Sequence, residues 1–540
     1  MVTFPRPESV LPVPLRDLVA DLEEASLVAV TASGPGPEAD DRSVTGVTLD
    51  SRQVRDGDLY AALPGANVHG ARFVAQAVAA GAVAVLTDRV GLELARQAGG
   101  ASDQVLPVVV VPDPRAALGR AAARIYRPSA GQDASMAVFG ITGTNGKTTT
   151  AYLVDGGLQA LGRTTGLIGT VETRIGDERI KSARTTPEAS DLQALLAVMA
   201  ERGVQRCTME VSSHALVMHR VDGLVYDVAA FTNLSQDHLD FHGTMEDYFL
   251  AKASLFTPER CRQGVVVVDD AWGVRLAAEA TVPVVTVAAR LPDADWQVRD
   301  LGDQRFELVG QGRTLQLRSP LPGDFNQLNT AVAALVLHLG GVDLEEAARA
   351  VCADPRVPGR MERVDAGGDD PMAVVDFAHT PDAVEAALAA LRSQTAGRLV
   401  AVVGAGGSRD AGKRPLMGAA AAAGADLVVI TDDNPRDEDP AAIRQAVAAG
   451  VGAQDRERVQ VVAGRADGIA AAVALTTGPQ DTVVVLGKGH EQGQEVAGEI
   501  HPFDDRDELR RALARRHTTN DERAGAPQVD GQTERGEGRP

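Results

Sequence analysis

"VFGITGTNGKTTTAYLV", which spans Val138–Val154, predicts a buried strand, a glycine-rich turn and a helix in direct succession. Gly143 and Gly146 allow the backbone N–H groups of the turn to point inward. Lys147 adds a positive charge, and the hydroxyl of Thr148 can hold Mg²⁺. The start of the helix contributes roughly half a further positive charge. The stretch therefore predicts a site for the phosphates of ATP or GTP.

The spacing of this turn departs from the standard phosphate-binding loop. In the pattern G-x-x-x-x-G-K-[ST] a glycine stands five residues before the second glycine, but Ile141 occupies that position here. An ordinary glycine turn with an exposed lysine is the alternative. We favour phosphate binding because a strand precedes the turn and a helix follows it.

Composition limits the classes of protein to which the chain can belong. Its 540 residues suggest two to four domains, and its hydrophobic content of 44% is ample for several cores. A net charge of −21 argues against nucleic acid as the main partner, because a phosphate backbone requires a basic face. The three cysteines form no C-x-x-C pair, which argues against a zinc knuckle or a disulfide framework. We find neither a signal peptide pattern nor a run of roughly 18 apolar residues, so we expect a cytoplasmic protein that does not enter membranes.

Short apolar runs alternate with helical patterns along most of the chain, which predicts an α/β fold with mainly parallel sheets. A linker-like stretch, "YRPSAGQDAS", precedes the phosphate-binding block, and "RVPGRMERV" interrupts the pattern again. We predict a small α/β N-terminal domain over 1–133, a central P-loop-type parallel-sheet ATPase domain over 134–357 and a Rossmann-like domain over 358–517. The polar, glycine-rich residues 518–540 are predicted to be a disordered tail.

Two segments of the central block carry groups that can hold a metal. Glu210 ends a buried strand in "TMEVSSHAL", where its carboxylate can reach Mg²⁺ or, alternatively, cap the next helix. "TNLSQDHLDFHG", residues 232–243, places Asp237 and His238 close to further acidic and histidine side chains. Zinc is disfavoured because neither cysteines nor an H-E-x-x-H pattern accompany them. Lys252 lies on the following helix, where a lysine is usually solvated.

Strand-end loops of the third block carry charged groups, and ligands bind at such loops in open α/β sheets. Arg409, Arg436 and Glu491 offer two cations and an anion, a set that suits an amino acid with an ammonium and a carboxylate at its far end. The alternative for "DNPR", residues 433–436, is a plain turn, since Asp, Asn and Pro all favour turns.

"GTNGKTT", residues 143–149, resembles the ATP-binding signature of the Mur ligase family, cytoplasmic enzymes that add amino acids to the peptidoglycan precursor. The resemblance extends from about residue 44 to about residue 515. It implies an ATP site built from Gly143, Thr144, Asn145, Gly146, Lys147, Thr148, Thr149, Arg360 and Asp376. It also implies Mg²⁺ held by Thr148, Glu210, His238 and Lys252, the last carbamylated to N6-carboxylysine. Lys147, Glu210, His238 and Lys252 are the implied catalytic residues.

The resemblance further implies that the first two blocks bind a UDP-N-acetylmuramoyl dipeptide. The matching positions are Leu49, Ser51, Ala66, Asn67, Val68, Thr185, Thr186, Ser212 and Arg220. Two positions depart from the family pattern: Arg184 stands where Asn is common, and Met218 stands where Gln is common. The sequence therefore does not decide whether this chain makes one or two of the family's polar contacts to the precursor.

The motif Asp433-Asn434-Pro435-Arg436 resembles that of family members that use meso-diaminopimelate, whereas the lysine users lack this arginine. The implied amino-acid site comprises Arg409, Asp433, Asn434, Pro435, Arg436, Gly487 and Glu491. Ser408 departs from the pattern, since Asp is more common there.

The implied function is an ATP-dependent ligase that adds meso-diaminopimelate to UDP-N-acetylmuramoyl-L-alanyl-D-glutamate through an acyl phosphate, in peptidoglycan precursor synthesis. We expect a monomer that binds these two substrates and ATP. A lysine-adding relative is one alternative. The other is a non-catalytic P-loop protein that senses the precursor, which the charged third block disfavours because a sensor need not recognise a second amino acid.

Overall fold

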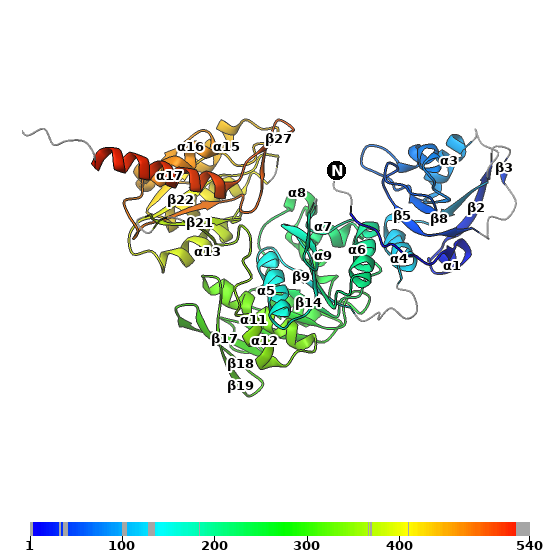
Figure 1. Ribbon diagram of the computed structural model, residues 1–540, viewed down its shortest axis with the longest axis horizontal. Coiled ribbons are helices and arrows are strands. Elements are labelled where there is room, and N and C mark those ends of the chain that lie inside the picture. Colours follow the sequence, from blue (N-terminus) through cyan, green and yellow to red (C-terminus); the bar gives the residue numbers. More distant parts are fainter. Residues whose placement is uncertain are drawn as a thin grey trace, which may run out of the picture. The chain divides into compact units, whose positions relative to one another are not determined.

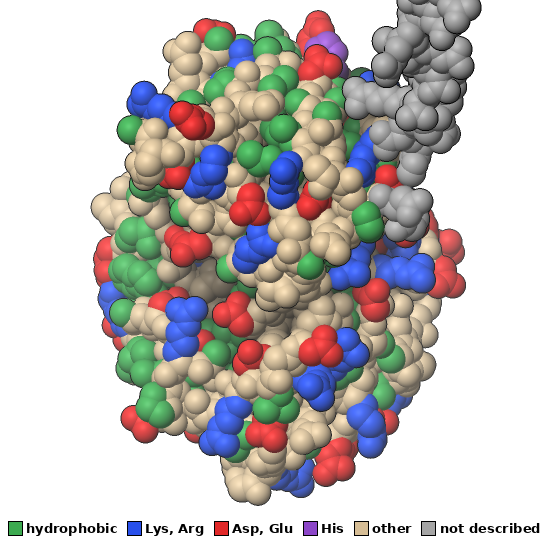
Figure 2. Space-filling view, turned by 90° about the vertical axis from the view of Figure 1, so that its left-hand side faces the viewer, with side chains coloured by type: hydrophobic (Ala, Val, Ile, Leu, Met, Phe, Trp, Pro, Cys, Tyr) green, Lys and Arg blue, Asp and Glu red, His purple; other side chains and the backbone are tan. Residues whose placement is uncertain are grey.

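The computed structural model describes residues 4–31, 34–35, 42–99, 105–127, 136–182, 184–365, 367, 370–408 and 410–524. The chain forms two compact units, residues 1–357 and 358–540. Sheets with helices packed on them make up both units, so the predicted α/β class is confirmed (Figure 1). No helix in these ranges is long and apolar enough to cross a membrane. Acidic and basic side chains are interspersed on the face shown in Figure 2.

A six-stranded sheet forms the first part of unit 1 within the described residues. The elements of this part are β1 (Val13–Pro14), α1 (Leu15–Ala20), β2 (Ser26–Thr31), β3 (Gly34–Pro35), β4 (Ser43–Val44), β5 (Gly46–Thr48), β6 (Asp58–Ala61), η1 (Gly70–Phe73), α2 (Val74–Ala79), β7 (Ala84–Thr87), α3 (Arg89–Gly99), β8 (Leu106–Val110) and α4 (Pro114–Ile125). The strand order is β3-β2-β8-β7-β6-β5, and β5 to β8 run parallel. Alternate side chains of β7 enter two different hydrophobic clusters, as expected for a parallel strand buried on both faces.

The second part of unit 1 is built on an 11-stranded sheet. Its elements are β9 (Ala137–Thr142), α5 (Lys147–Ala160), β10 (Thr165–Ile168), β11 (Glu172–Ile175), β12 (Glu178–Lys181), α6 (Ala189–Glu201), β13 (Arg206–Glu210), α7 (Ser213–Val217), β14 (Val228–Phe231), α8 (Leu239–His242), α9 (Met245–Ala253), β15 (Gly264–Val267), α10 (Ala271–Glu279), β16 (Val284–Ala288), β17 (Trp296–Gly302), β18 (Arg305–Gly310), β19 (Arg313–Arg318), α11 (Asp324–Leu339) and α12 (Leu344–Ala350). The strand order is β12-β11-β10-β13-β9-β14-β15-β16-β17-β18-β19. The strands from β10 to β17 in this order are parallel, and antiparallel strands extend both ends. The phosphate turn joins central strand β9 to α5.

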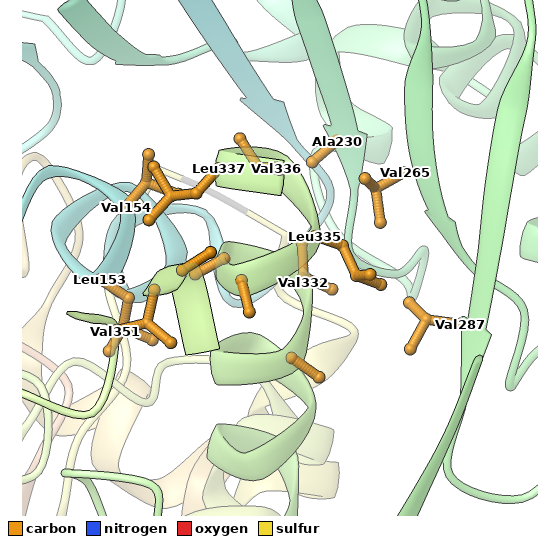
Figure 3. Close-up of a cluster of buried hydrophobic side chains, with 14 of the residues drawn as sticks. Leu153, Val154, Ala230, Val265, Val287, Val332, Leu335, Val336, Leu337 and Val351 are labelled. Carbon is orange, nitrogen blue, oxygen red and sulfur yellow. The ribbon is translucent and has the colours of Figure 1, made fainter. Parts of the chain in front are cut away.

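Helix α11 fixes the position of α5, and with it the phosphate turn. Figure 3 shows α11 beside α5, with strands of the sheet on the other side of α11. Val336 and Leu337 lie near Leu153 and Val154 of α5, while Leu335 points toward the strands. The α11 core residues are almost completely buried. Removing a large side chain here would cost about 2–5 kcal/mol, so the turn rests on a rigid base.

Unit 2 contains a six-stranded sheet in the order β20-β21-β25-β22-β23-β24, again within the described residues. Its elements are β20 (Glu362–Val364), β21 (Met372–Asp376), α13 (Pro381–Arg392), β22 (Leu399–Val403), α14 (Lys413–Gly424), β23 (Leu427–Ile430), α15 (Pro440–Ala448), η2 (Ala453–Arg458), β24 (Val459–Val461), α16 (Arg465–Ala474), β25 (Thr482–Leu486), β26 (Gly493–Val496), β27 (Glu499–Pro502) and α17 (Asp505–Ala524). All strands of the six-stranded sheet except β20 are parallel, so their carboxyl ends share one edge. Helix α17 continues beyond residue 517, where we placed the start of a disordered tail. Residues 525–540 of that predicted tail lie outside the described residues.

Candidate active site

The phosphate turn has a backbone shape that requires glycine. Gly143 and Gly146 adopt φ angles of 146° and 86°. A Cβ at Gly143 would lie 1.9 Å from the Thr232 hydroxyl, which sits at the end of neighbouring β14. Asn233 holds the turn from the same strand end: its Oδ1 accepts the Asn145 N–H at 2.9 Å. The turn is therefore preformed rather than dependent on a ligand for its shape.

Lys147 is half-buried and hydrogen-bonded, not exposed as an ordinary turn lysine would be. Its ammonium donates to the Gly143 carbonyl at 2.9 Å and to the Thr144 carbonyl at 2.8 Å. The charge thus lies inside the turn, where phosphate oxygens would sit.

Glu210 is 1% exposed and ends β13, the neighbour of β9 in the sheet. Its carboxylate accepts the Thr148 hydroxyl at 2.8 Å, the Thr170 N–H at 2.7 Å and the Thr170 hydroxyl at 3.0 Å. A buried carboxylate beside the loop threonine suits Mg²⁺, which uses one or two protein oxygens and takes the rest from phosphates and water. No group of three or more His, Cys, Asp or Glu side chains in the described part of the chain is arranged to hold a metal by itself. The residues present therefore fit a magnesium ion that arrives with a nucleotide.

Lys252 is 1% exposed, so the general expectation of a solvated lysine on a surface helix does not apply. Its Nζ donates to the Gly143 carbonyl at 2.8 Å and lies 4.7 Å from the centre of the Tyr248 ring. Burial, and secondly the nearby Lys147 cation, hold the pKa of Lys252 well below its usual range. The side chain that the sequence pattern would leave in solvent is thus buried against the phosphate turn.

His238 lies at the start of α8 in a left-handed conformation, with φ at 55°. Its ring stands edge-on to His214 with 4.9 Å between centroids, and its Nε2 lies 3.5 Å from an Asp237 carboxylate oxygen. Burial first, and then the neighbouring cations, lower the pKa of His238. A neutral imidazole keeps a lone pair that can bind a metal.

The predicted precursor residues fall into two groups of unit 1. Ser51 is buried in the first part, where its hydroxyl donates to Gln76, whereas Leu49 is half-buried and residues 66–68 form an exposed loop. Thr185, Thr186 and Ser212 lie beside Glu210: the Thr186 hydroxyl donates to the Glu210 carbonyl at 2.9 Å. The Thr185 hydroxyl lies 3.0 Å from that of Thr170.

Unit 2 brings most of the predicted amino-acid residues together at the carboxyl ends of β23 and β25. Asn434 donates from Nδ2 to Glu491 at 2.9 Å. Gly487 approaches Asp433 so closely that a Cβ would lie 2.6 Å from its carboxylate. Pro435 is buried next to them, and Arg409 lies outside the described residues.

Arg436 is held in a left-handed conformation with φ at 51°. Its Nε donates to Glu495 at 3.0 Å and its Nη1 to the Gly407 carbonyl at 2.8 Å. The backbone of Arg436 also pairs with the β26–β27 hairpin, since its N–H donates to the Glu495 carbonyl. The guanidinium is therefore positioned but already shares its charge with Glu495.

Arg360 and Asp376, predicted to serve ATP, both lie in unit 2 next to Phe377. The Arg360 guanidinium lies 4.4 Å from the centre of the Phe377 ring. Asp376 accepts the N–H groups of Met361 and Ala378 at 2.7 and 2.8 Å. Burial raises the pKa of Asp376, and the Arg360 charge opposes that shift.

Models of three Mur ligase domains match the chain. The family catalytic domain matches residues 43–126, the middle domain 141–337 and the glutamate ligase domain 359–489. A curated relative from Streptomyces coelicolor, UDP-N-acetylmuramoyl-L-alanyl-D-glutamate–2,6-diaminopimelate ligase, is 55% identical over 94% of this chain and 98% of its own length. The chain belongs to the Mur ligase family.

Other Mur ligases extend this comparison. UDP-N-acetylmuramyl-tripeptide synthetase from Leifsonia xyli subsp. xyli is 46% identical and covers 91% of this chain and 95% of the relative. A solved structure of UDP-N-acetylmuramoyl-L-alanyl-D-glutamate–2,6-diaminopimelate ligase has a TM-score of 0.64 and 32% identity, over 94% of this chain and all of that one. As a Mur ligase, the chain is an ATP-dependent enzyme that forms amide bonds. The predicted family, fold and enzyme class are confirmed, and the relatives' names agree with the predicted function.

Sequence reasoning missed several polar residues of this Mur ligase. Thr170 follows β10 and binds Glu210, and Asn329 of α11 accepts the Thr150 hydroxyl behind the phosphate turn at 3.3 Å. Lys488, which is fully buried, donates to both Asn434 and Glu491 at 2.9 Å. Asn329 could have been identified from the sequence, because polar residues at the start of an otherwise apolar helix need buried partners.

Proposed function

We propose that this Mur ligase joins 2,6-diaminopimelate to UDP-N-acetylmuramoyl-L-alanyl-D-glutamate with the energy of ATP. The observation that carries the choice of amino acid is Arg436, which the β26–β27 hairpin and Gly407 hold at the strand-end loop. Diaminopimelate differs from lysine by a distal carboxylate, and a guanidinium binds a carboxylate in a two-pronged manner. The identity of 55% to a ligase named for this amino acid supports the same choice.

The reaction requires activation because a carboxylate is a poor electrophile. An oxygen of the D-glutamyl side-chain carboxylate attacks the γ-phosphorus of ATP, and ADP leaves. The amine of diaminopimelate then attacks the acyl carbon, an amide bond forms, phosphate leaves and the amine loses a proton. Lys147, inside the phosphate turn, neutralises charge on the transferred group.

Glu210 and Thr148 are the residues that would hold Mg²⁺, and His238 would contribute to a second Mg²⁺. The ion would neutralise phosphate charge when bound. Lys252, as a carbamate, would contribute two acceptor oxygens to the same site. Its burial and lowered pKa support this modification, since only the neutral amine reacts with CO₂.

The precursor would extend from the first part of unit 1, at Leu49, Ser51 and the 66–68 loop, toward Thr185, Thr186, Ser212 and Arg220. The hydroxyl contacts of Thr186 with the Glu210 carbonyl and with Ser212 support a peptide end near the phosphates. Arg360 and Asp376 of unit 2 would serve ATP. We also propose a cytoplasmic location, as the resemblance to the Mur ligase family implies, and a monomeric state.

A panel of amino acids with ATP and the UDP-dipeptide, read by product mass, tests the proposal. The expected product contains diaminopimelate, and ADP is released only when both substrates are present. The Leifsonia relative's name leaves the amino acid open, so lysine is the essential comparison. A lysine product of equal yield would favour the lysine-adding alternative, and ADP release without the precursor would contradict the ligase reaction.

A further inference from the structure

Glu495 of β26 brings a carboxylate to the amino-acid site of unit 2 that the sequence motifs did not include. Its Oε2 accepts a hydrogen bond from Arg436 Nε at 3.0 Å. The other oxygen, Oε1, has no hydrogen-bond partner in the part of the chain that the structure describes. The Glu495 side chain is 41% exposed, so a ligand can reach that oxygen.

Backbone hydrogen bonds hold Glu495 beside the 433–436 loop. Its N–H donates to Asn434 Oδ1 at 3.0 Å, and its carbonyl accepts the Arg436 N–H at 3.0 Å. The neighbouring Gln494 donates from Nε2 to the Asp433 carbonyl at 2.6 Å. The carboxylate is therefore placed by the hairpin and does not depend on its contact with the guanidinium alone.

Arg436 keeps donors for a ligand while it is paired with Glu495. Glu495 takes the Nε–H, and the Gly407 carbonyl takes one Nη1 hydrogen at 2.8 Å. The remaining N–H groups are on Nη1 and Nη2, and two of them can bind a carboxylate side by side. A ligand carboxylate bound there would share one guanidinium with Glu495. Two negative charges would then face one positive charge, and a further cation would restore the balance.

Glu491, the acidic residue that the sequence predicted for this site, already has a cation of its own. Its Oε2 accepts Lys488 Nζ and Asn434 Nδ2, both at 2.9 Å. The Lys488 side chain is fully buried, so it cannot turn away into solvent. The charge of Glu491 thus stays balanced within the protein, whereas Glu495 loses its balance when a ligand carboxylate binds Arg436.

Other cations near the loop, among the described residues, also have partners. Arg414 donates to both carboxylate oxygens of Glu438, at 2.8 and 2.9 Å. Arg465 donates to Asp505 and lies 3.7 Å from Asp433, so two carboxylates share this guanidinium. These neighbours add no unpaired positive charge, and a balancing cation has to come with the ligand.

We propose that Glu495 binds the distal ammonium of diaminopimelate while Arg436 binds the carboxylate on the same carbon. The inference rests on the proposed function, since it assumes that Arg436 receives that carboxylate. Diaminopimelate brings one charge of each sign to the Arg436–Glu495 pair and leaves it balanced. 2-Aminopimelate, which lacks the distal ammonium, brings only the negative charge. Glu495 thus selects against a distal carboxylate that no ammonium accompanies.

The preference of the full chain for diaminopimelate over 2-aminopimelate tests this assignment in wild type and Glu495→Gln. The amide oxygen of Gln can still accept the Arg436 Nε–H, so the change removes the charge and keeps the guanidinium in position. Glu495→Gln should lose about 10-fold in kcat/KM for diaminopimelate, the value of one charge-assisted contact at a partly exposed site. 2-Aminopimelate should bind more tightly, measured as a lower Ki against diaminopimelate, because the repelling carboxylate is gone.

Glu499→Gln is the matched control. It removes the same charge from β27 of the same hairpin, where Glu499 is 82% exposed and lies 4.0 Å from His501. This variant should keep the wild-type preference between the two amino acids. KM for ATP should be unchanged in both variants, which shows that the ATP site is intact.

The possible failures differ from one another. An equal loss for both amino acids in Glu495→Gln would reduce Glu495 to a positioning residue for Arg436, and no loss for either would leave only a surface ion pair. A loss confined to diaminopimelate in Glu491→Gln, with Glu495→Gln unaffected, would assign the ammonium to Glu491. A wild type that forms no product with diaminopimelate would contradict the proposed function, whereas an active wild type whose preference survives Glu495→Gln would contradict this inference alone.

Discussion

Replacing Arg436 by Ala should remove most of the preference for diaminopimelate over lysine. The guanidinium has five donors, of which Nε and one Nη1 hydrogen are used by Glu495 and Gly407. The others can reach a ligand carboxylate. Two charge-assisted hydrogen bonds to a partly exposed group are worth about 2–3 kcal/mol together, which corresponds to about 30- to 150-fold in kcat/KM.

The expected loss of preference is smaller than it would be if lysine left a buried arginine unpaired. Lysine as substrate would leave Arg436 paired with Glu495, so no isolated cation is stranded. Ala adds little new backbone strain, because Arg436 already carries a Cβ at a φ of 51°. The folded structure should therefore survive the substitution.

The assay compares kcat/KM for diaminopimelate and for lysine in wild type, Arg436→Ala and Arg436→Lys. Arg436→Lys keeps the charge but loses the fork, so it should recover only part of the preference. KM for ATP should change little in either variant. The reasoning is refuted if wild type uses lysine as well as diaminopimelate, or if Arg436→Ala keeps the wild-type ratio.

Three further expectations concern the phosphate site. Lys147→Ala should reduce kcat by at least about 10²-fold. Its unfolding free energy should fall by only about 1–2 kcal/mol, because two hydrogen bonds to loop carbonyls are lost. Turnover near that of wild type in the folded variant would exclude the assigned role. Intact-protein mass should reveal one added CO₂, absent from Lys252→Ala, and a short carboxylic acid should partly restore that inactive variant. Lys252→Met should be more stable than unmodified wild type at neutral pH, and chemical denaturation should show this advantage shrinking toward about pH 10.4, the pKa of an unfolded lysine. The folded pKa of Lys252 is lowered, so the unfolded chain binds more protons within this window; a pH-independent difference would contradict the assigned shift.

Motifs within a few residues of each other were accessible from the sequence. The turn at 143–149 and the loop at 433–436 could be predicted because each combines a strand end with residues whose backbone or charge has a direct use. Alternating apolar runs likewise predicted the parallel sheets, since buried strands and helices differ in length and pattern. These signals depend only on residues that are close in the sequence, and the fold contains the elements that they predict.

Contacts between distant segments could not be predicted in the same way. Lys252 sits on a helix whose pattern permits exposure, but its amine meets Gly143, 109 residues earlier. Glu188 meets Arg115 across 73 residues. Lys488 is only three residues from Glu491, yet its burial depends on the whole edge of the unit 2 sheet. Each is a charged side chain whose environment is set by tertiary packing. Composition and periodicity carry no information about that environment.

The shared carbonyl of Gly143 has a consequence for the order in which the site is assembled. Lys147 and Lys252 both donate to that one oxygen, so each ammonium raises the cost of charging the other. Burial first, and then this conflict, lower the pKa of Lys252, which favours the neutral, nucleophilic amine. Phosphate groups would reverse the local potential, favour the protonated amine and repel a newly formed carbamate. For the carbamate that we propose, we therefore expect carbon dioxide to be captured before the nucleotide arrives, so that a chain that met ATP first would have to release it to become modified.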